Sequence, residues 1–221
     1  MLPMPSKAQL RHRMPRLLFG LVLFGIGIAM LVIADLGLAP WEVLHQGISE
    51  RTGIPIGTVG IITGVCVLFL WIPLRERPGV GTIANVLLIG IVIDVTLWLA
   101  PESAGGAWVR WALLIGGTLV IAIGSGFYIG AGLGPGPRDG LMTGLGHRGI
   151  PIGLARAVIE LGGLGIGWVM GGTVGVGTVV FAFGVGPLVG WILPVLSLED
   201  LVAPIVDPPS DDSVPDTFWV E

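Results

Sequence analysis

The chain has 221 residues, of which 53% are hydrophobic and only 12% are charged. Its mean hydropathy of +0.91 lies far from that of water-soluble domains. The composition therefore argues against a soluble catalytic domain, gives no support to nucleic-acid binding, and favours a protein embedded in a lipid bilayer. The formal net charge of −4 is unevenly distributed, because basic residues gather near the start and acidic residues near the end.

Six segments are long and apolar enough to cross a bilayer. A span needs roughly 17 to 25 apolar residues, because about 30 Å of hydrocarbon is crossed at about 1.5 Å per residue. In chain order, the expected spans are 17–34, 57–73, 81–100, 111–131, 152–170 and 177–198. The sequence thus predicts an all-α membrane protein with about six transmembrane helices.

The remaining segments divide the chain around these spans. Residues 1–16 are expected to form a basic cytoplasmic N-terminus, and residues 101–110 an outer linker. The apolar run that follows the basic start is too long for a signal peptide and has no A-x-A-like site after it, so we expect it to be retained as a helix. Residues 199–221 are rich in proline and acidic residues, which is typical of a disordered tail.

Basic residues near helix ends favour the cytoplasmic side of a membrane. If the N-terminus is inside, the inner side receives Lys7, Arg11, Arg13, Arg16, Arg75, Arg77, Arg138 and Arg148. Only Arg51 and Arg110 then fall outside. Four tryptophans are expected near the outer interface, where indole rings commonly anchor: Trp98, Trp108, Trp111 and Trp168. Six spans would return the C-terminus to the cytoplasm.

The two halves of the chain read alike. Three blocks recur in order at offsets of 95 or 96 residues: 37–40 with 132–135, 53–57 with 149–153, and 79–82 with 175–178. Each half, 17–100 and 111–198, holds three expected spans, so the second copy must enter the membrane from the opposite side. The sequence therefore predicts two inverted three-helix repeats.

Two short polar segments, 40–55 and 135–151, lie between expected spans and are bounded by glycine and proline. They are too short and too polar to cross a bilayer, and each is expected to form a short helix and a turn. Two alternatives stay open. The segments either lie flat at the interface or are re-entrant from opposite faces, which would require surrounding protein or a water-filled cavity.

Each short segment carries an acidic residue soon after a proline, Glu42 in the first and Asp139 in the second. A carboxylate there complements the free N–H groups at a helix start. If the segments are re-entrant, the same residues become gate or ion-binding groups, with Arg138 suited to an inner gate. His45 completes an E-x-x-H spacing found in some metal sites, but Met142 takes its place in the second copy, so no metal site is expected.

Three ionisable residues fall within expected spans, where each charge costs about 2.5 to 3.5 kcal/mol at the membrane centre. Arg156 and Glu160 are four residues apart on one helix face and are expected to pair. The pair either neutralises itself, or Glu160 takes up and releases a proton near mid-bilayer. We expect Asp94 to face protein or water, and Asn85 to form a hydrogen bond across the bundle. Together these four residues form the predicted solute or ion pathway.

The G-L-x-P blocks with their acidic residue, the G-I-P-I-G turns and the G-x-G-T blocks resemble the YczE/YyaS/YitT family of bacterial integral membrane proteins, in particular its YczE-like branch. The resemblance covers roughly residues 15–198. It implies a multi-pass protein of the bacterial inner membrane, in a family often suspected of transport. It implies no substrate and no site residues.

The chain has no Walker A sequence, no G-x-S-x-G elbow and no H-E-x-x-H motif, and Cys66 is its single cysteine. We therefore expect neither an enzyme nor a cofactor. The expected function is transport or export of a small solute across the lipid bilayer. Two alternatives stay open: a substrate-capturing subunit that works with a separate ATPase, and a non-catalytic accessory or scaffold protein. The sequence leaves open a homo-oligomer or a partner membrane subunit.

Overall fold

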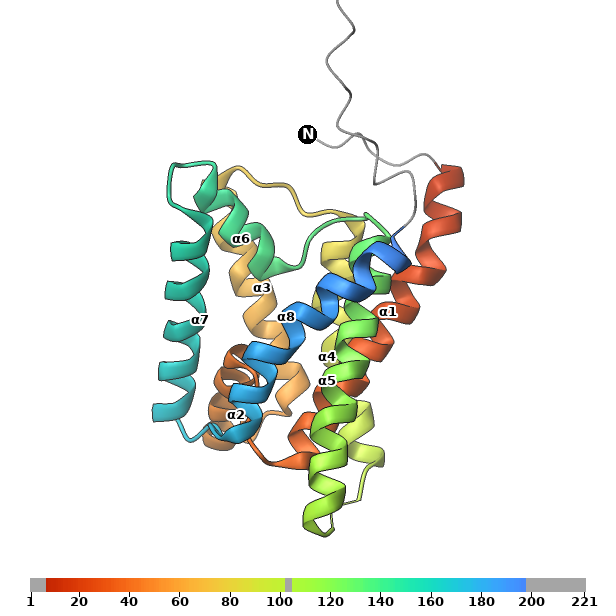
Figure 1. Ribbon diagram of the computed structural model, residues 1–221. Helices are drawn as coiled ribbons and strands as arrows, with labels where there is room; N and C mark the ends of the chain where they lie inside the picture. Colours follow the sequence, from red (N-terminus) through yellow and green to blue (C-terminus); the bar gives the residue numbers. More distant parts are fainter. Residues whose placement is uncertain (1–6, 102–104, 198–221) are drawn as a thin grey trace, which may run out of the picture.

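The computed structural model describes residues 7–101 and 105–197, and every regular element in these ranges is a helix (Figure 1). In chain order the helices are α1 (Lys7–Ala34), α2 (Pro40–Thr52), α3 (Ile56–Leu74), α4 (Val80–Leu99), α5 (Ala107–Gly130), α6 (Pro137–Gly146), α7 (Ile152–Val169) and α8 (Val176–Leu196). The expected all-α fold is confirmed. The acidic tail expected over 199–221 lies outside the described residues.

Six of these helices, α1, α3, α4, α5, α7 and α8, are long and apolar enough to cross a membrane. They match the six expected spans. The largest difference is at the first, because α1 begins at Lys7, inside the segment expected to precede it. Prolines set several other starts: Pro40 is the first residue of α2, and Pro55 directly precedes α3. A proline is tolerated there because the first N–H groups of a helix have no partner within it.

The two short helices, α2 and α6, lie at opposite ends of the bundle (Figure 1). A Cβ on Gly163 would lie 3.9 Å from the carbonyl oxygen of Pro40, so the start of α2 lies beside the interior of α7 and not beside its end. Likewise, the Trp71 indole N–H donates to the Pro137 carbonyl (2.9 Å), which places the start of α6 before the end of α3. Both short helices therefore begin inside the bundle and end at its rim.

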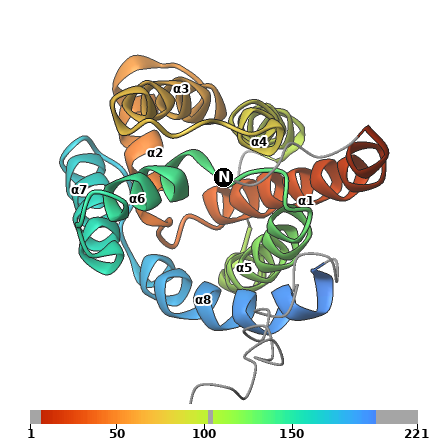
Figure 2. The same cartoon turned by 90° about the horizontal axis from the view of Figure 1, so that it is seen from above.

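The helices pack as two groups of four. In the core group, α1 packs against α5 and α4, and α5 packs against α8. In the site group, α2 packs against α7 and α3, and α6 packs against α3 and α7. The two groups meet chiefly where α3 packs against α4. On the other side, α7 and α8 diverge from the loop that joins them, as both views show (Figures 1 and 2).

Glycines bring α1 and α5 together at the centre of the core group. A Cβ on Gly20 would lie only 2.7 Å from the Gly124 carbonyl oxygen, and a Cβ on Gly117 would lie 2.9 Å from the Gly27 oxygen. Small residues allow two membrane helices to approach this closely. The contacts are reciprocal. Gly117 follows Gly20 by 97 residues and faces Gly27, and Gly124 follows Gly27 by 97 residues and faces Gly20.

The repeated G-x-G-T blocks begin α4 and α8 and anchor two turns of the chain. The Gly81 N–H donates to the Leu133 carbonyl after α5 (2.8 Å), and the Gly177 N–H donates to the Leu36 carbonyl after α1 (2.7 Å). In each block the threonine hydroxyl oxygen accepts a hydrogen bond from the first glycine (3.1 and 3.2 Å). These motifs therefore have a structural role.

The structure shifts one of the expected correspondences between the two halves. Gly37 and Gly134 both have a positive φ, of 110° and 129°. A Cβ on Gly37 would meet the Thr178 hydroxyl at 2.8 Å, and one on Gly134 would meet the Thr82 hydroxyl at 2.9 Å. The structural counterpart of Gly37 is thus Gly134 and not Gly132. The sequence comparison aligned the identical pairs Gly37-Leu38 and Gly132-Leu133, whereas the glycine with the same turn contact as Gly37 is Gly134.

Candidate functional site

Charged side chains of the site group gather where the two short helices begin. Glu42 lies in the first turn of α2, and Arg138 and Asp139 lie in the first turn of α6. Arg138 interacts electrostatically with Glu42, Asp139 and Glu160 of α7. We call these four residues the central cluster. The sequence had assigned them to separate gate and pathway sets, and the fold brings them together.

Three carboxyl groups of this cluster lie within electrostatic range of the Arg138 guanidinium. Glu42, Arg138 and Glu160 are each half-buried, and Asp139 is exposed. Burial raises the pKa of Glu42 above its ordinary value; the Arg138 charge opposes this rise and the Glu160 charge adds to it. Glu42 therefore holds a proton more tightly than a carboxyl in water does, which suits a group that exchanges protons.

Polar groups of the core group approach the cluster at Gly136, the residue before α6. A Cβ on Gly136 would lie 3.1 Å from both an Asp139 carboxylate oxygen and the Tyr128 hydroxyl, and 3.8 Å from the Asn85 amide nitrogen. Tyr128 is 4% exposed, and its hydroxyl forms no hydrogen bond with any described residue. The sequence analysis missed Tyr128, although it is the only tyrosine in the chain.

His45 and Trp41 extend this polar region along α2. The His45 ring faces α3, where a Cβ on Gly60 would lie 3.5 Å from its Nδ1. The His45 Nε2 and Trp41 Nε1 atoms are buried without a hydrogen-bond partner among the described residues. Burial lowers the pKa of His45 to about 4, so the ring is neutral at pH 7. No three metal-binding side chains gather anywhere in the described part of the chain.

The predicted pairing of Arg156 with Glu160 is present in α7, at an N···O distance of 3.5 Å. The two side chains differ in exposure: that of Arg156 is 65% exposed and that of Glu160 is 25% exposed. Glu160 also interacts electrostatically with Glu42 and Arg138. It therefore belongs to the central cluster, and Arg156 lies at its edge.

Asp94 lies apart from the central cluster, at the end of the bundle where α3 begins. Its carboxylate accepts hydrogen bonds from the Gly57 N–H (2.6 Å) and the Thr58 hydroxyl (2.7 Å). The residue before α3 is Pro55, which has no side chain that can cap the helix. Asp94 supplies this cap from α4 and so fastens the core group to the site group.

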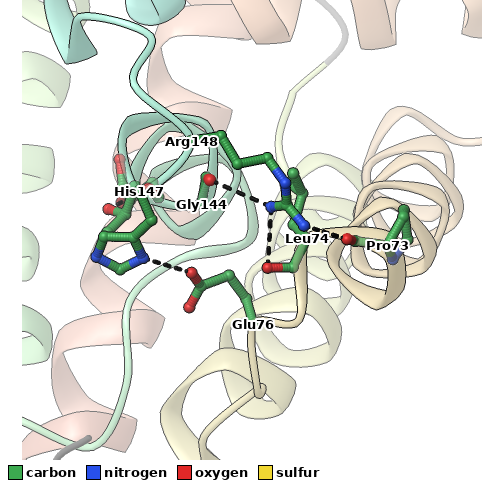
Figure 3. A network of polar contacts seen from close by, with 8 residues as sticks. Pro73, Leu74, Glu76, Gly144, His147 and Arg148 are labelled. Atoms are coloured by element: carbon green, nitrogen blue, oxygen red, sulfur yellow. Dashed lines mark hydrogen bonds and ion pairs between the residues drawn. The ribbon is translucent and has the colours of Figure 1, made fainter.

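Two arginines fasten the short helices to the opposite half of the chain. Arg51, at the end of α2, donates to the carbonyls of Val169 and Met170, both at 2.9 Å. Arg148, just after α6, donates to the carbonyls of Pro73 and Leu74 at the end of α3 (Figure 3). Each guanidinium satisfies carbonyls that have no partner within their own helix. The sequence analysis used both residues only to assign the membrane sides.

A further polar contact lies at the α6 end of the bundle, where the His147 ring Nδ1 is 2.8 Å from the Glu76 carboxylate (Figure 3). At the other end Arg110, at the start of α5, donates to the Ala34 carbonyl (2.7 Å) and pairs with Asp35 (2.8 Å). Polar contacts thus bind neighbouring segments at both rims of the bundle.

The long apolar helices, the short helices between them and the charged cluster inside the bundle define a multi-pass α-helical membrane protein. The chain belongs to the family described as "Family of unknown function (DUF6198)", which matches residues 11–194. This agrees with the resemblance noted in the sequence.

Curated relatives match most of the chain. A protein of Haemophilus influenzae, named "Uncharacterized protein", is 37% identical over 183 residues, which cover 82% of this chain and 83% of the relative. "Uncharacterized membrane protein YczE" of Bacillus subtilis is 32% identical over 180 residues, covering 79% and 82%. "Uncharacterized protein YyaS" of the same species is 22% identical over 183 residues, covering 80% and 90%. No solved structure matches the chain.

Proposed function

We propose that this protein is a transporter or exporter of a small polar solute in the bacterial inner membrane. The central cluster is the observation that carries the proposal. Its charged side chains come from α2, α6 and α7 and meet within a bundle of apolar spans. Charges at the membrane centre cost about 2.5 to 3.5 kcal/mol each and typically mark solute or ion pathways.

The proposal includes an inverted repeat with two re-entrant helices. The paired contacts of α1 with α5 and of the two G-x-G-T blocks support the repeat. The inward starts of α2 and α6 at opposite ends of the bundle support re-entry (Figure 1). With both termini in the cytoplasm, the α6 end faces inward, which agrees with the basic residues near that end.

Cysteine accessibility tests the membrane arrangement. Single cysteines are placed along 40–55 and 135–151 in a Cys66→Ala background and labelled in intact cells with permeant and impermeant reagents. Re-entrant helices should label from opposite sides, with protection increasing toward Pro40 and Pro137. Uniform labelling of both segments as surface loops would contradict re-entry and remove the support for a central solute site.

Transport is tested with the purified protein in liposomes. The vesicles are incubated with mixtures of amino acids, organic acids and amines, and their contents are analysed by mass spectrometry. We expect vesicles with the parent protein to accumulate a solute, and we expect Glu42→Gln and Arg138→Lys to abolish this accumulation. Glu50→Gln should preserve it, because Glu50 is an exposed carboxyl at the far end of the same helix.

Two outcomes would favour the other functions. Co-purification of an ATPase that is needed for solute uptake would identify a capture subunit. If no solute is transported and cells with Glu42→Gln or Arg138→Lys keep their phenotype, the transport proposal fails and a scaffold function takes its place.

A further inference from the structure

The contact between α3 and α4 depends on two facing glycines. A Cβ on Gly57 would lie 2.0 Å from the Gly90 carbonyl oxygen, and a Cβ on Gly90 would lie 2.4 Å from the Gly57 oxygen. The Asp94 carboxylate lies one turn further along α4 and holds the start of α3. Close backbone packing and a charged cap therefore fasten the site group to the core group on this side.

The second half of the chain keeps the glycines but not the contact. The offset of 96 residues between the G-x-G-T blocks makes Gly153 and Gly186 the counterparts of Gly57 and Gly90. A Cβ on either residue would meet nothing within 4 Å. Gly190 stands where Asp94 stands in the first half, and the space beside it is also open. The helices α7 and α8 thus carry the glycines that could pack them together, but the two helices do not touch at these glycines.

Side-chain sizes on α7 and α8 are compatible with closure. In the first half, a Cβ on Gly64 would lie 3.1 Å from a methyl carbon of Val86. The counterparts, at the same offset, are Glu160 and Ala182. The second half thus has a larger residue on α7 in place of a glycine and a smaller one on α8 in place of a valine, and Ala182 is exposed.

We propose that the site group moves between α4 and α8. In the structure described here, α3 packs against α4; in the second state, α7 packs against α8 through Gly153 and Gly186, and α3 separates from α4. Asp94 acts as a latch for the first state, and Gly190 leaves the second state without one. This inference rests on the proposed repeat and transport function. The movement would carry the central cluster along with the site group.

Cysteine pairs in a Cys66→Ala background test the movement. Gly64→Cys with Val86→Cys reports the first state, because a Cβ on Gly64 would lie 3.6 Å from the Val86 Cβ, within disulfide range. Ala157→Cys with Gly186→Cys reports the second state. This second pair is the counterpart of Ile61 and Gly90 in the first half, where a Cβ on Gly90 would lie 2.5 Å from the Ile61 side chain.

We expect both pairs to form disulfides within one chain during mild oxidation of membranes. Asp94→Ala should increase the rate for the second-state pair by at least about ten-fold, because it removes the charged cap that holds the first state. A control pairs Ala157→Cys with Phe183→Cys, since Phe183 is 78% exposed and its counterpart Leu87 is also exposed. This control should not cross-link.

Three results would overturn the proposal. The second-state pair could remain reduced while the first-state pair forms readily, its disulfide could join two chains, or its rate could be unchanged by Asp94→Ala. Because cross-linking needs no solute, the movement is tested separately from transport. If the expected cross-links form and no solute is moved in liposomes, the proposed function fails and the two-state movement stands.

Discussion

Replacement of Asp94 should destabilise the fold by an amount that follows from its contacts. In Asp94→Ala, the Gly57 N–H and the Thr58 hydroxyl lose their acceptor at 2.6 and 2.7 Å. Each charged hydrogen bond contributes about 1.5 to 3 kcal/mol, but one carboxylate makes both, so the losses do not add in full. We expect the free energy of unfolding to fall by about 2 to 3 kcal/mol.

A thermal melt in detergent, followed by circular dichroism, measures this loss. For a chain of this length, about 2 to 3 kcal/mol corresponds to a decrease in Tm of roughly 4 to 12 °C. Asp94→Asn keeps one acceptor oxygen and should lose less. Asp35→Ala is the matched control, because the Asp35 side chain is 61% exposed in its pair with Arg110, and such pairs contribute about 1 kcal/mol or less.

The reasoning would be refuted if Asp94→Ala melted within about 2 °C of the parent protein, or no lower than Asp35→Ala. Either result would mean that the start of α3 is held by packing alone. The assignment of Asp94 as a latch between the two helix groups would then lose its energetic basis.

Three further predictions concern packing, capping and protonation. Gly117→Ala should sharply reduce the yield of folded protein, because its Cβ would lie 2.9 Å from the Gly27 carbonyl oxygen; Gly116→Ala, which meets only the flexible end of Met30 at 3.2 Å, should be tolerated. Arg148→Ala should lower the free energy of unfolding by about 1 to 2 kcal/mol, measured by the same melts. Burial raises the pKa of Glu42, so the folded state binds this proton more tightly than the unfolded state does. The contribution of Glu42 to the free energy of unfolding therefore falls as the pH rises above the ordinary carboxyl range. Glu42→Gln should reduce that fall between pH 5 and 8.

The sequence determined the kind of protein and most of its elements. Long apolar runs must become helices in a bilayer, because no water is present to satisfy the backbone polar groups. Proline and glycine then set where α2 begins and ends, and proline sets where α3 begins. The pairing of Arg156 with Glu160 was also readable, because helical geometry fixes neighbours four residues apart.

Only the tertiary structure decided which distant residues meet. Glu42, Arg138 and Glu160 come from three helices, and no local spacing could place them together. Asp94 looked like a pathway residue because a carboxyl in an apolar helix is costly, yet the start of another helix satisfies it. The sequence also left open the separation of α7 from α8, because helix packing depends on the shapes of whole surfaces and not on the composition of either helix.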